Sequence, residues 1–139
     1  MTLLEVLVAL SLVGAVAGLG FATAARWRDR ESVETAAGRL LEAYRRTQSV
    51  ARAWGRPAEL LVTPDSLIIR AVWLGESTEV WRGPGPGRAG VGLAPNRHVA
   101  AFLPSGLATG ASNVTHLLTR GAAHRRVVVS RIGRVRVGP

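Results

Sequence analysis

Residues 1–25 read MTLLEVLVALSLVGAVAGLGFATAA, and the twenty residues from Val6 to Ala25 contain no charged side chain. An α-helix rises 1.5 Å per residue, so about twenty residues cover about 30 Å, the thickness of the hydrocarbon core of a bilayer. We therefore predict a hydrophobic helix over residues 1–25 that is long enough to cross a membrane. Glu5 lies at the edge of this apolar stretch. A carboxylate is costly there, which indicates a functional partner for it.

The helix is predicted to continue as an amphipathic segment over residues 26–55. Apolar residues recur there at spacings of three, four and seven, which is typical of a helix with one buried stripe. The stripe consists of Val33, Ala37, Leu40, Leu41, Tyr44 and Ala51. Gly55 followed by Arg56 and Pro57 predicts the end, since glycine accepts a left-handed cap and proline cannot continue the helix.

Residues 56–139 are predicted to form a β-rich domain. Ala58–Thr63 and Leu67–Leu74 flank a turn at residues 64–66 and predict a hairpin. Shorter strands are predicted at Thr78–Arg82, His98–Leu103, Val114–Thr119, Arg125–Ser130 and Arg134–Val137, with Gly121 and Gly133 in turns. The glycine- and proline-rich stretches Gly83–Gly92 and Pro104–Ser112 are predicted loops, and Trp73 and Trp81 are expected in the core. The predicted fold class is α+β, with a long N-terminal helix packed on a β-rich C-terminal domain.

Charge is distributed unevenly along the chain. Residues 1–79 hold nine arginines and all nine acids, whereas residues 80–139 hold nine arginines and no acid, and therefore carry the whole net charge of +9. Such asymmetry is informative about partners, and nucleic acid, anionic lipid or an acidic neighbouring subunit are the candidates. The chain has no cysteine, which excludes disulfides and thiolate chemistry.

The end of the chain carries a candidate nucleic-acid site. In a strand, Arg134 and Arg136 point to one face about 7 Å apart, near the spacing of adjacent phosphates. Arg125, Arg126 and Arg131 are candidates to extend this patch. Contact with DNA would then be mostly to phosphate and strongly salt-dependent. The alternative is a solvated strand face that ends a hairpin.

Catalysis has little support in the sequence. His98, His116 and His124 are scattered, and no spacing of histidines or carboxylates suggests a metal site. The glycine-rich stretch lacks the lysine and the strand–helix context of a phosphate-binding loop. We predict no enzymatic activity, no metal and no cofactor.

The string MTLLEVLVAL resembles the start of a mature type IV pilin or pseudopilin, in which a prepilin peptidase has removed a short leader. The resemblance implies that Met1 is the processed and methylated N-terminus. It implies that Glu5 neutralises the N-terminal amine of a neighbouring subunit in a filament. The implied partners are other pilin subunits, the bacterial inner membrane, the prepilin peptidase and the assembly platform, with the domain outside the cytoplasm and the filament in the periplasm or on the cell surface.

The distal sequence is similar to H-type (GspH) minor pseudopilins of type II secretion and to FimT-type minor pilins. The similar segments are Ala51–Pro57, Phe102–Gly106 and Val127–Val137. FimT-type minor pilins that take up DNA carry a GRxR motif, which this chain matches at Gly133, Arg134 and Arg136.

The resemblance implies a minor pilin that acts in assembly initiation or at the tip of a type IV pilus-like filament, with DNA contact as an added role. One alternative is the H-type pseudopilin of a type II secretion system. Another is a membrane-anchored binding domain that does not polymerise. For the N-terminus alone, a plain anchor remains open, as does a signal peptide with a cleavage site at Ala22-Thr23-Ala24. Arg26, Arg28 and Arg30 follow the apolar stretch, and the positive-inside rule would keep this end cytoplasmic, unlike in pilins.

Overall fold

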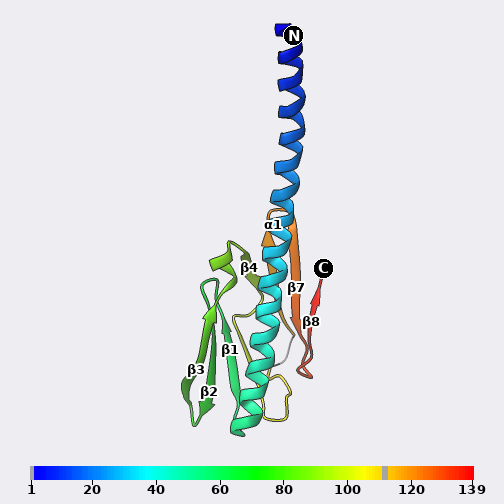
Figure 1. The fold of residues 1–139 in the computed structure, drawn as a ribbon. Helices are drawn as coiled ribbons and strands as arrows, with labels where there is room; N and C mark the ends of the chain where they lie inside the picture. Colours follow the sequence, from blue (N-terminus) through cyan, green and yellow to red (C-terminus); the bar gives the residue numbers. More distant parts are fainter. Residues whose placement is uncertain (1, 111–112) are drawn as a thin grey trace.

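One helix, α1 (Leu3–Trp54), runs through 52 residues and forms the long axis of the molecule (Figure 1). The computed structural model describes residues 2–110 and 113–139, and for residues 16–20 and 22 only the backbone. At 1.5 Å per residue α1 is about 78 Å long. It ends at Gly55, which has the left-handed φ of 60° and donates its N–H to the carbonyls of Ala51 and Arg52. The predicted helix end is confirmed.

Two antiparallel sheets of four strands each pack against the second half of α1 (Figure 1). The first has the order β3-β2-β1-β5 and consists of β1 (Ala58–Val62), β2 (Ser66–Trp73), β3 (Glu76–Pro84) and β5 (Val99–Phe102). The second has the order β4-β6-β7-β8 and consists of β4 (Gly92–Pro95), β6 (Val114–Arg120), β7 (Ala123–Val129) and β8 (Val135–Gly138). The predicted α+β class is therefore confirmed.

The predicted loop at Gly83–Gly92 is only partly a loop. It contains the short 3₁₀ helix η1 (Pro86–Ala89) and leads into β4, which the sequence analysis missed. β4 pairs with β6 over four residues, from Gly92 opposite Thr119 to Pro95 opposite His116. An edge strand this short, with glycine and proline at its ends, carries almost no periodic signal, because its pairing rather than its own sequence defines it.

The hydrophobic core lies between α1 and the inner faces of both sheets. On α1 the predicted stripe is buried at Val33, Ala37, Leu40, Tyr44 and Ala51, and half-buried at Leu41. The sheets contribute alternate residues, among them Leu60, Ile69, Phe102, Leu118 and Val127. The buried stripe starts only at Val33, so the domain packs on the second half of the helix.

The first half of α1 projects from the domain (Figure 1). Its large apolar side chains that the structure describes are exposed. These side chains are Leu3, Leu4, Val6, Leu7, Val8, Leu10, Leu12, Val13, Phe21 and Trp27. Residues 16–20 and 22 of the predicted span Val6–Ala25 lie outside the described side chains. Among the residues that are described, no helix is both long and apolar enough to cross a membrane.

Of the two tryptophans expected in the core, one packs against it and the other does not. Trp81 is half-buried against the core, with the Arg46 guanidinium 5.0 Å from its ring centroid. Trp73 is half-exposed, and the Arg56 guanidinium stacks 4.0 Å from its ring centroid. Trp73 ends β2, next to the end of α1, so no helix covers it. The prediction that Trp73 lies in the core was wrong.

Candidate functional site

Glu5 is exposed in the first turn of α1 and is engaged within its own chain. Its Oε2 accepts a hydrogen bond of 2.8 Å from the Thr2 backbone N–H, and the Thr2 Oγ1 accepts one of 3.3 Å from the Glu5 N–H. The two residues therefore form a capping box, which satisfies two N–H groups that a helix start leaves unpaired. Met1, the predicted N-terminal partner of Glu5, lies outside the described residues.

Three of the five candidate arginines share one exposed face of the second sheet. Val127 and Val129 point from β7 to the core, so Arg126 and Val128 point outward. Arg136 is paired with Val128 and therefore points outward too, diagonal to Arg126 at about 7–8 Å. Arg134 extends the same ladder through a 2.9 Å bond from the Ser130 N–H to its carbonyl, and is exposed. We call Arg126, Arg134 and Arg136 the arginine face.

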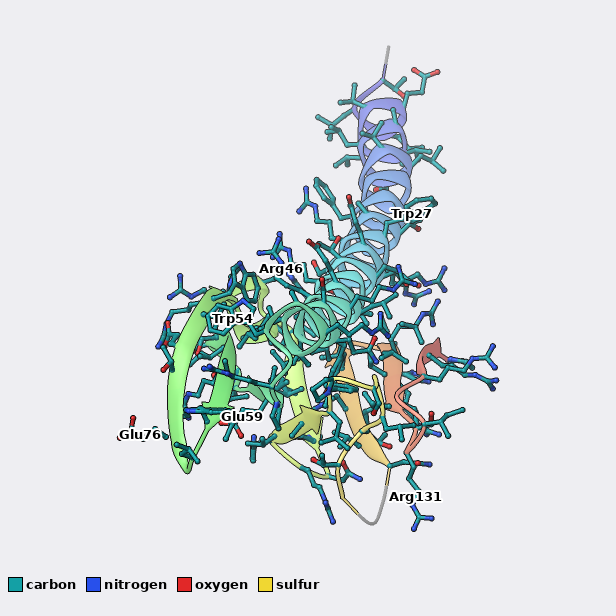
Figure 2. All side chains as sticks on the ribbon, turned by 90° about the horizontal axis from the view of Figure 1, so that it is seen from below. Trp27, Arg46, Trp54, Glu59, Glu76 and Arg131 are labelled. Carbon is teal, nitrogen blue, oxygen red and sulfur yellow. The ribbon has the colours of Figure 1, made fainter. Side chains whose placement is uncertain are left out.

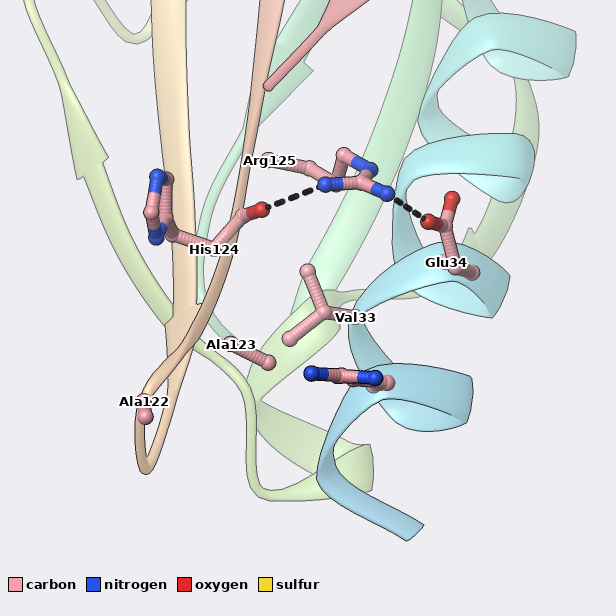
Figure 3. Close-up of a pocket in the computed structure, with 7 residues that line it drawn as sticks. Val33, Glu34, Ala122, Ala123, His124 and Arg125 are labelled. Carbon is pink, nitrogen blue, oxygen red and sulfur yellow. Dashed lines mark hydrogen bonds and ion pairs between the residues drawn. The ribbon is translucent and has the colours of Figure 1, made fainter. Parts of the chain in front are cut away.

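The other two candidates lie elsewhere. Arg125 is on the inward face of β7, half-buried, and forms an ion pair with Glu34 of α1 (Figure 3). Its Nη1 also donates to the His124 carbonyl at 3.1 Å. The pair borders a cavity of about 300 Å³ between α1 and the β6–β7 turn. Arg131 lies in the β7–β8 turn, where its carbonyl accepts a 3.1 Å bond from the Ala108 N–H. Arg125 therefore joins β7 to α1 and is not part of the arginine face.

The glycine of the GRxR motif has a structural reason. Gly133 has a φ of 78°, and a Cβ added to it would collide with the Gly106 carbonyl oxygen. Its own carbonyl accepts a 2.5 Å hydrogen bond from Gln48 Nε2 of α1. A Cβ added to Gly106 would in turn meet Arg52 Nη2 at 2.9 Å. Thus the segments Phe102–Gly106 and Val127–Val137 and the last turn of α1 meet in one place.

The chain shares its fold with a type IV minor pilin. Two crystal structures of the minor pilin FimU from Pseudomonas aeruginosa superpose on it with TM-scores of 0.68 and 0.64. The first match has 16% sequence identity and covers 79% of this chain and 90% of FimU, and the second has 15% identity and covers 76% and 92%. No protein-family model and no curated protein sequence matches this chain. The likeness establishes the pilin-like fold.

A buried polar pair was missed by the sequence analysis. His116 of β6 and Tyr44 of α1 are both 0% exposed, with the His116 Nε2 and the Tyr44 hydroxyl hydrogen-bonded at 2.5 Å. The other ring nitrogen of His116, Nδ1, has no hydrogen-bond partner among the described residues. Burial lowers the pKa of His116 to about 4, helped by the nearby His98, and burial raises the pKa of Tyr44. The alternation of Val114, His116 and Leu118 was a signal that His116 points inward.

The described residues do not form a metal site. Among them, no three His, Cys, Asp or Glu side chains come together in a way that could hold a metal ion. Two surfaces stand out among the described residues: the exposed apolar side chains in the first half of α1, and the arginine face.

Proposed function

We propose that this chain is a minor pilin-like subunit of a type IV pilus-like filament. One observation carries the proposal: α1 extends far beyond its own domain, and its first half exposes large apolar side chains from Leu3 to Trp27. Exposed apolar surface of this extent marks an interaction with a membrane or with other proteins. Helices of neighbouring subunits would cover it in a filament, and the inner membrane would cover it before assembly.

Glu5 is proposed to set the register of assembly by pairing with the N-terminal amine of a neighbouring Met1. Both charges would be buried among apolar helices, and an unpaired charge in such a place costs about 3–5 kcal/mol. Pairing therefore favours one axial position of the incoming subunit over all others. Prepilin peptidase would generate the free amine of Met1, and the assembly platform would extract the subunit from the membrane. A subunit present in few copies would act in the initiation of assembly or at the tip of the filament.

The test is the replacement Glu5→Ala in the full-length chain, scored by its amount in purified filaments. We expect the variant to accumulate in the membrane fraction and to be absent from filaments. Thr2→Ala is the matched control, because it breaks the capping box and keeps the carboxylate. It should cost only about 1 kcal/mol of helix stability and leave incorporation unchanged. If Glu5→Ala enters filaments as well as wild type, Glu5 does not set the register of assembly. If wild type itself is absent from filaments, the chain is a membrane-anchored binding domain, and the proposed function is wrong.

DNA contact at the arginine face is a second candidate role. The face gathers Arg126, Arg134 and Arg136, and no acid follows Glu79 in the chain. Binding to phosphate releases counterions, so affinity should fall steeply with salt, and removing two contacts should reduce the slope of log K against log salt by about 1.8.

The measurement is a salt titration of DNA binding by the full-length chain in non-ionic detergent micelles. The variant Arg134→Ala/Arg136→Ala is compared with Arg28→Ala/Arg45→Ala, which removes the same charge from exposed positions of α1. We expect the first variant to bind more weakly with a smaller salt slope, and the second to resemble wild type. Equal binding by both variants would make the arginine face a protein interface, which favours an H-type pseudopilin of a secretion system.

A further inference from the structure

The end of the domain farthest from the N-terminus exposes an unusual number of large apolar side chains. Four segments lie at this end: the end of α1, the β2–β3 turn, the loop after β5 and the β7–β8 turn (Figure 1). We call this surface the distal pole, and Figure 2 looks onto it, with Trp54 and Arg131 on either side of the helix end. Its exposed apolar side chains are Trp54, Trp73, Leu74, Leu103, Leu107 and Ile132, each between 37% and 87% exposed.

Contacts between the four segments fix the pole as one surface. Arg56, just after α1, stacks on Trp73 at the β2–β3 turn. Gln48 of α1 donates to the Gly133 carbonyl in the β7–β8 turn, and the Ala108 N–H of the loop after β5 donates to the Arg131 carbonyl. The apolar side chains are therefore held on connected backbone and do not belong to four independent loops.

Leu74 is placed at the pole against local preference. It is the one non-glycine residue with positive φ among the described residues, at 50°, and it is 87% exposed. With Gly75 at φ 85° it forms a two-residue hairpin turn of the kind that favours asparagine or aspartate in the first position. A strained backbone and an exposed leucine are both unfavourable for the isolated fold. Such an outlier is a reason to look for a function.

The composition and charge of the pole match a protein interface. Its exposed apolar side chains include two tryptophans, and large exposed apolar side chains gathered at one end of a domain mark an interaction site. The same segments contain the basic residues Arg52, Arg56 and Arg131 and the acidic residue Glu76, so basic residues outnumber acidic ones at the pole. Tryptophan and arginine are also the residue types that dominate interface energetics.

We propose that the distal pole is the docking surface for another protein subunit, which presents an apolar centre with acidic residues around it. The pole lies at the opposite end of α1 from the apolar half, so a membrane that holds that half cannot reach the pole. Two poles of the same chain would bring like charges together, which disfavours a second copy. The inference rests on the proposed function in one respect: the partner is placed in the filament, as the subunit stacked on the distal pole.

Single cysteines can test the pole because the chain has none. Full-length Ile132→Cys and Leu107→Cys are labelled with a small maleimide in intact producing cells and as purified chains in detergent. The control is Val99→Cys, 41% exposed, at the end of β5 away from the pole. Relative to this control, we expect labelling at the pole to be about fivefold slower in cells, because the centre of an interface excludes the reagent.

Two changes should restore labelling at the pole. Leu74→Asn suits the left-handed backbone, so it should weaken docking without harm to the fold. Arg52→Glu with Arg56→Glu should repel an acidic rim, and circular dichroism of the purified chain checks its folding. Labelling as fast at the pole as at Val99→Cys would overturn the proposal, and protection that survives charge reversal would overturn the acidic rim.

Other occupants give distinct outcomes. A disulfide between two Ile132→Cys chains would assign the pole to a second copy. Protection of the purified chain by vesicles of phosphatidylglycerol and phosphatidylcholine alone would assign it to lipid. Either result overturns the proposal. The amount of the chain in filaments is measured separately. Slow labelling of the pole in a chain that is absent from filaments would refute the filament role and support the docking surface. Fast labelling of the pole in assembled filaments would refute the docking surface and support the filament role.

Discussion

Acidification should destabilise the domain through one buried histidine. His116 is fully buried and its pKa is lowered from 6.5 to about 4, first by burial and then by His98. A protonated ring would carry an N–H at Nδ1, which has no acceptor among the described residues. The folded state therefore holds His116 neutral, bonded to Tyr44, at every pH above about 4.

The direction of the effect follows from proton binding. Between pH 4 and 6.5 the unfolded chain protonates this histidine and the folded chain does not, so stability falls as the pH falls through this window. The lowering of the His116 pKa from 6.5 to about 4 corresponds to about 3 kcal/mol of stability, which is lost in full only near pH 4. For a small domain with a stability of about 5–15 kcal/mol this is a large fraction.

The assay is urea unfolding of the full-length chain in detergent between pH 4 and 7.5, followed by far-ultraviolet circular dichroism. His116→Gln is expected to be less stable than wild type at pH 7, but its residue 116 cannot take up a proton. Between pH 7 and pH 4 the variant should therefore lose about 3 kcal/mol less stability than wild type loses. The carboxylates are common to both chains and cancel in the difference. His124→Gln, at an exposed position, should follow wild type. Parallel pH profiles for wild type and His116→Gln would refute the argument.

Two further predictions concern backbone positions. Gly133→Ala should destabilise the domain by about 2–4 kcal/mol, since the new methyl group meets the Gly106 carbonyl at a positive φ. The control Gly138→Ala, whose methyl group meets nothing within 4 Å, should leave the melting temperature unchanged. Equal losses of melting temperature in both variants would contradict the steric account. Leu74→Asn should stabilise the isolated chain by about 0.5–1 kcal/mol in thermal unfolding, because asparagine accepts this backbone at lower cost; a loss of stability would show that Leu74 is not strained.

Short sequence patterns predicted the helix end and the turns, whereas features that depend on contacts between distant residues could not be predicted from the sequence. The end of α1 at Gly55 and the turns at Gly121 and Gly133 depend on a few neighbouring residues, and the structure has them as predicted. β4 exists only through its pairing with β6. Trp73 is a strand residue by any local measure, and its exposure follows from where α1 stops.

The candidate site shows the same division. Arg125 and Arg126 are adjacent in a strand, so they must point to opposite faces. The run of three valines from 127 to 129 does not indicate which face is inward, and only the fold revealed Val127 and Val129 in the core and Glu34 opposite Arg125. The Tyr44–His116 pair joins residues 72 apart in sequence, and no local pattern links them.

If Glu5 pairs with a neighbouring amine as proposed, the capping box at the start of α1 makes subunit addition an exchange reaction. The Glu5 carboxylate already accepts the Thr2 N–H at 2.8 Å, so a neighbouring amine must compete with a bond that exists before the encounter. If the carboxylate leaves, the helix start loses about 1 kcal/mol, which is subtracted from the gain of the new pair. Because the partner would be replaced and the carboxylate never left bare, such an exchange would lower the barrier to joining and the barrier to leaving together.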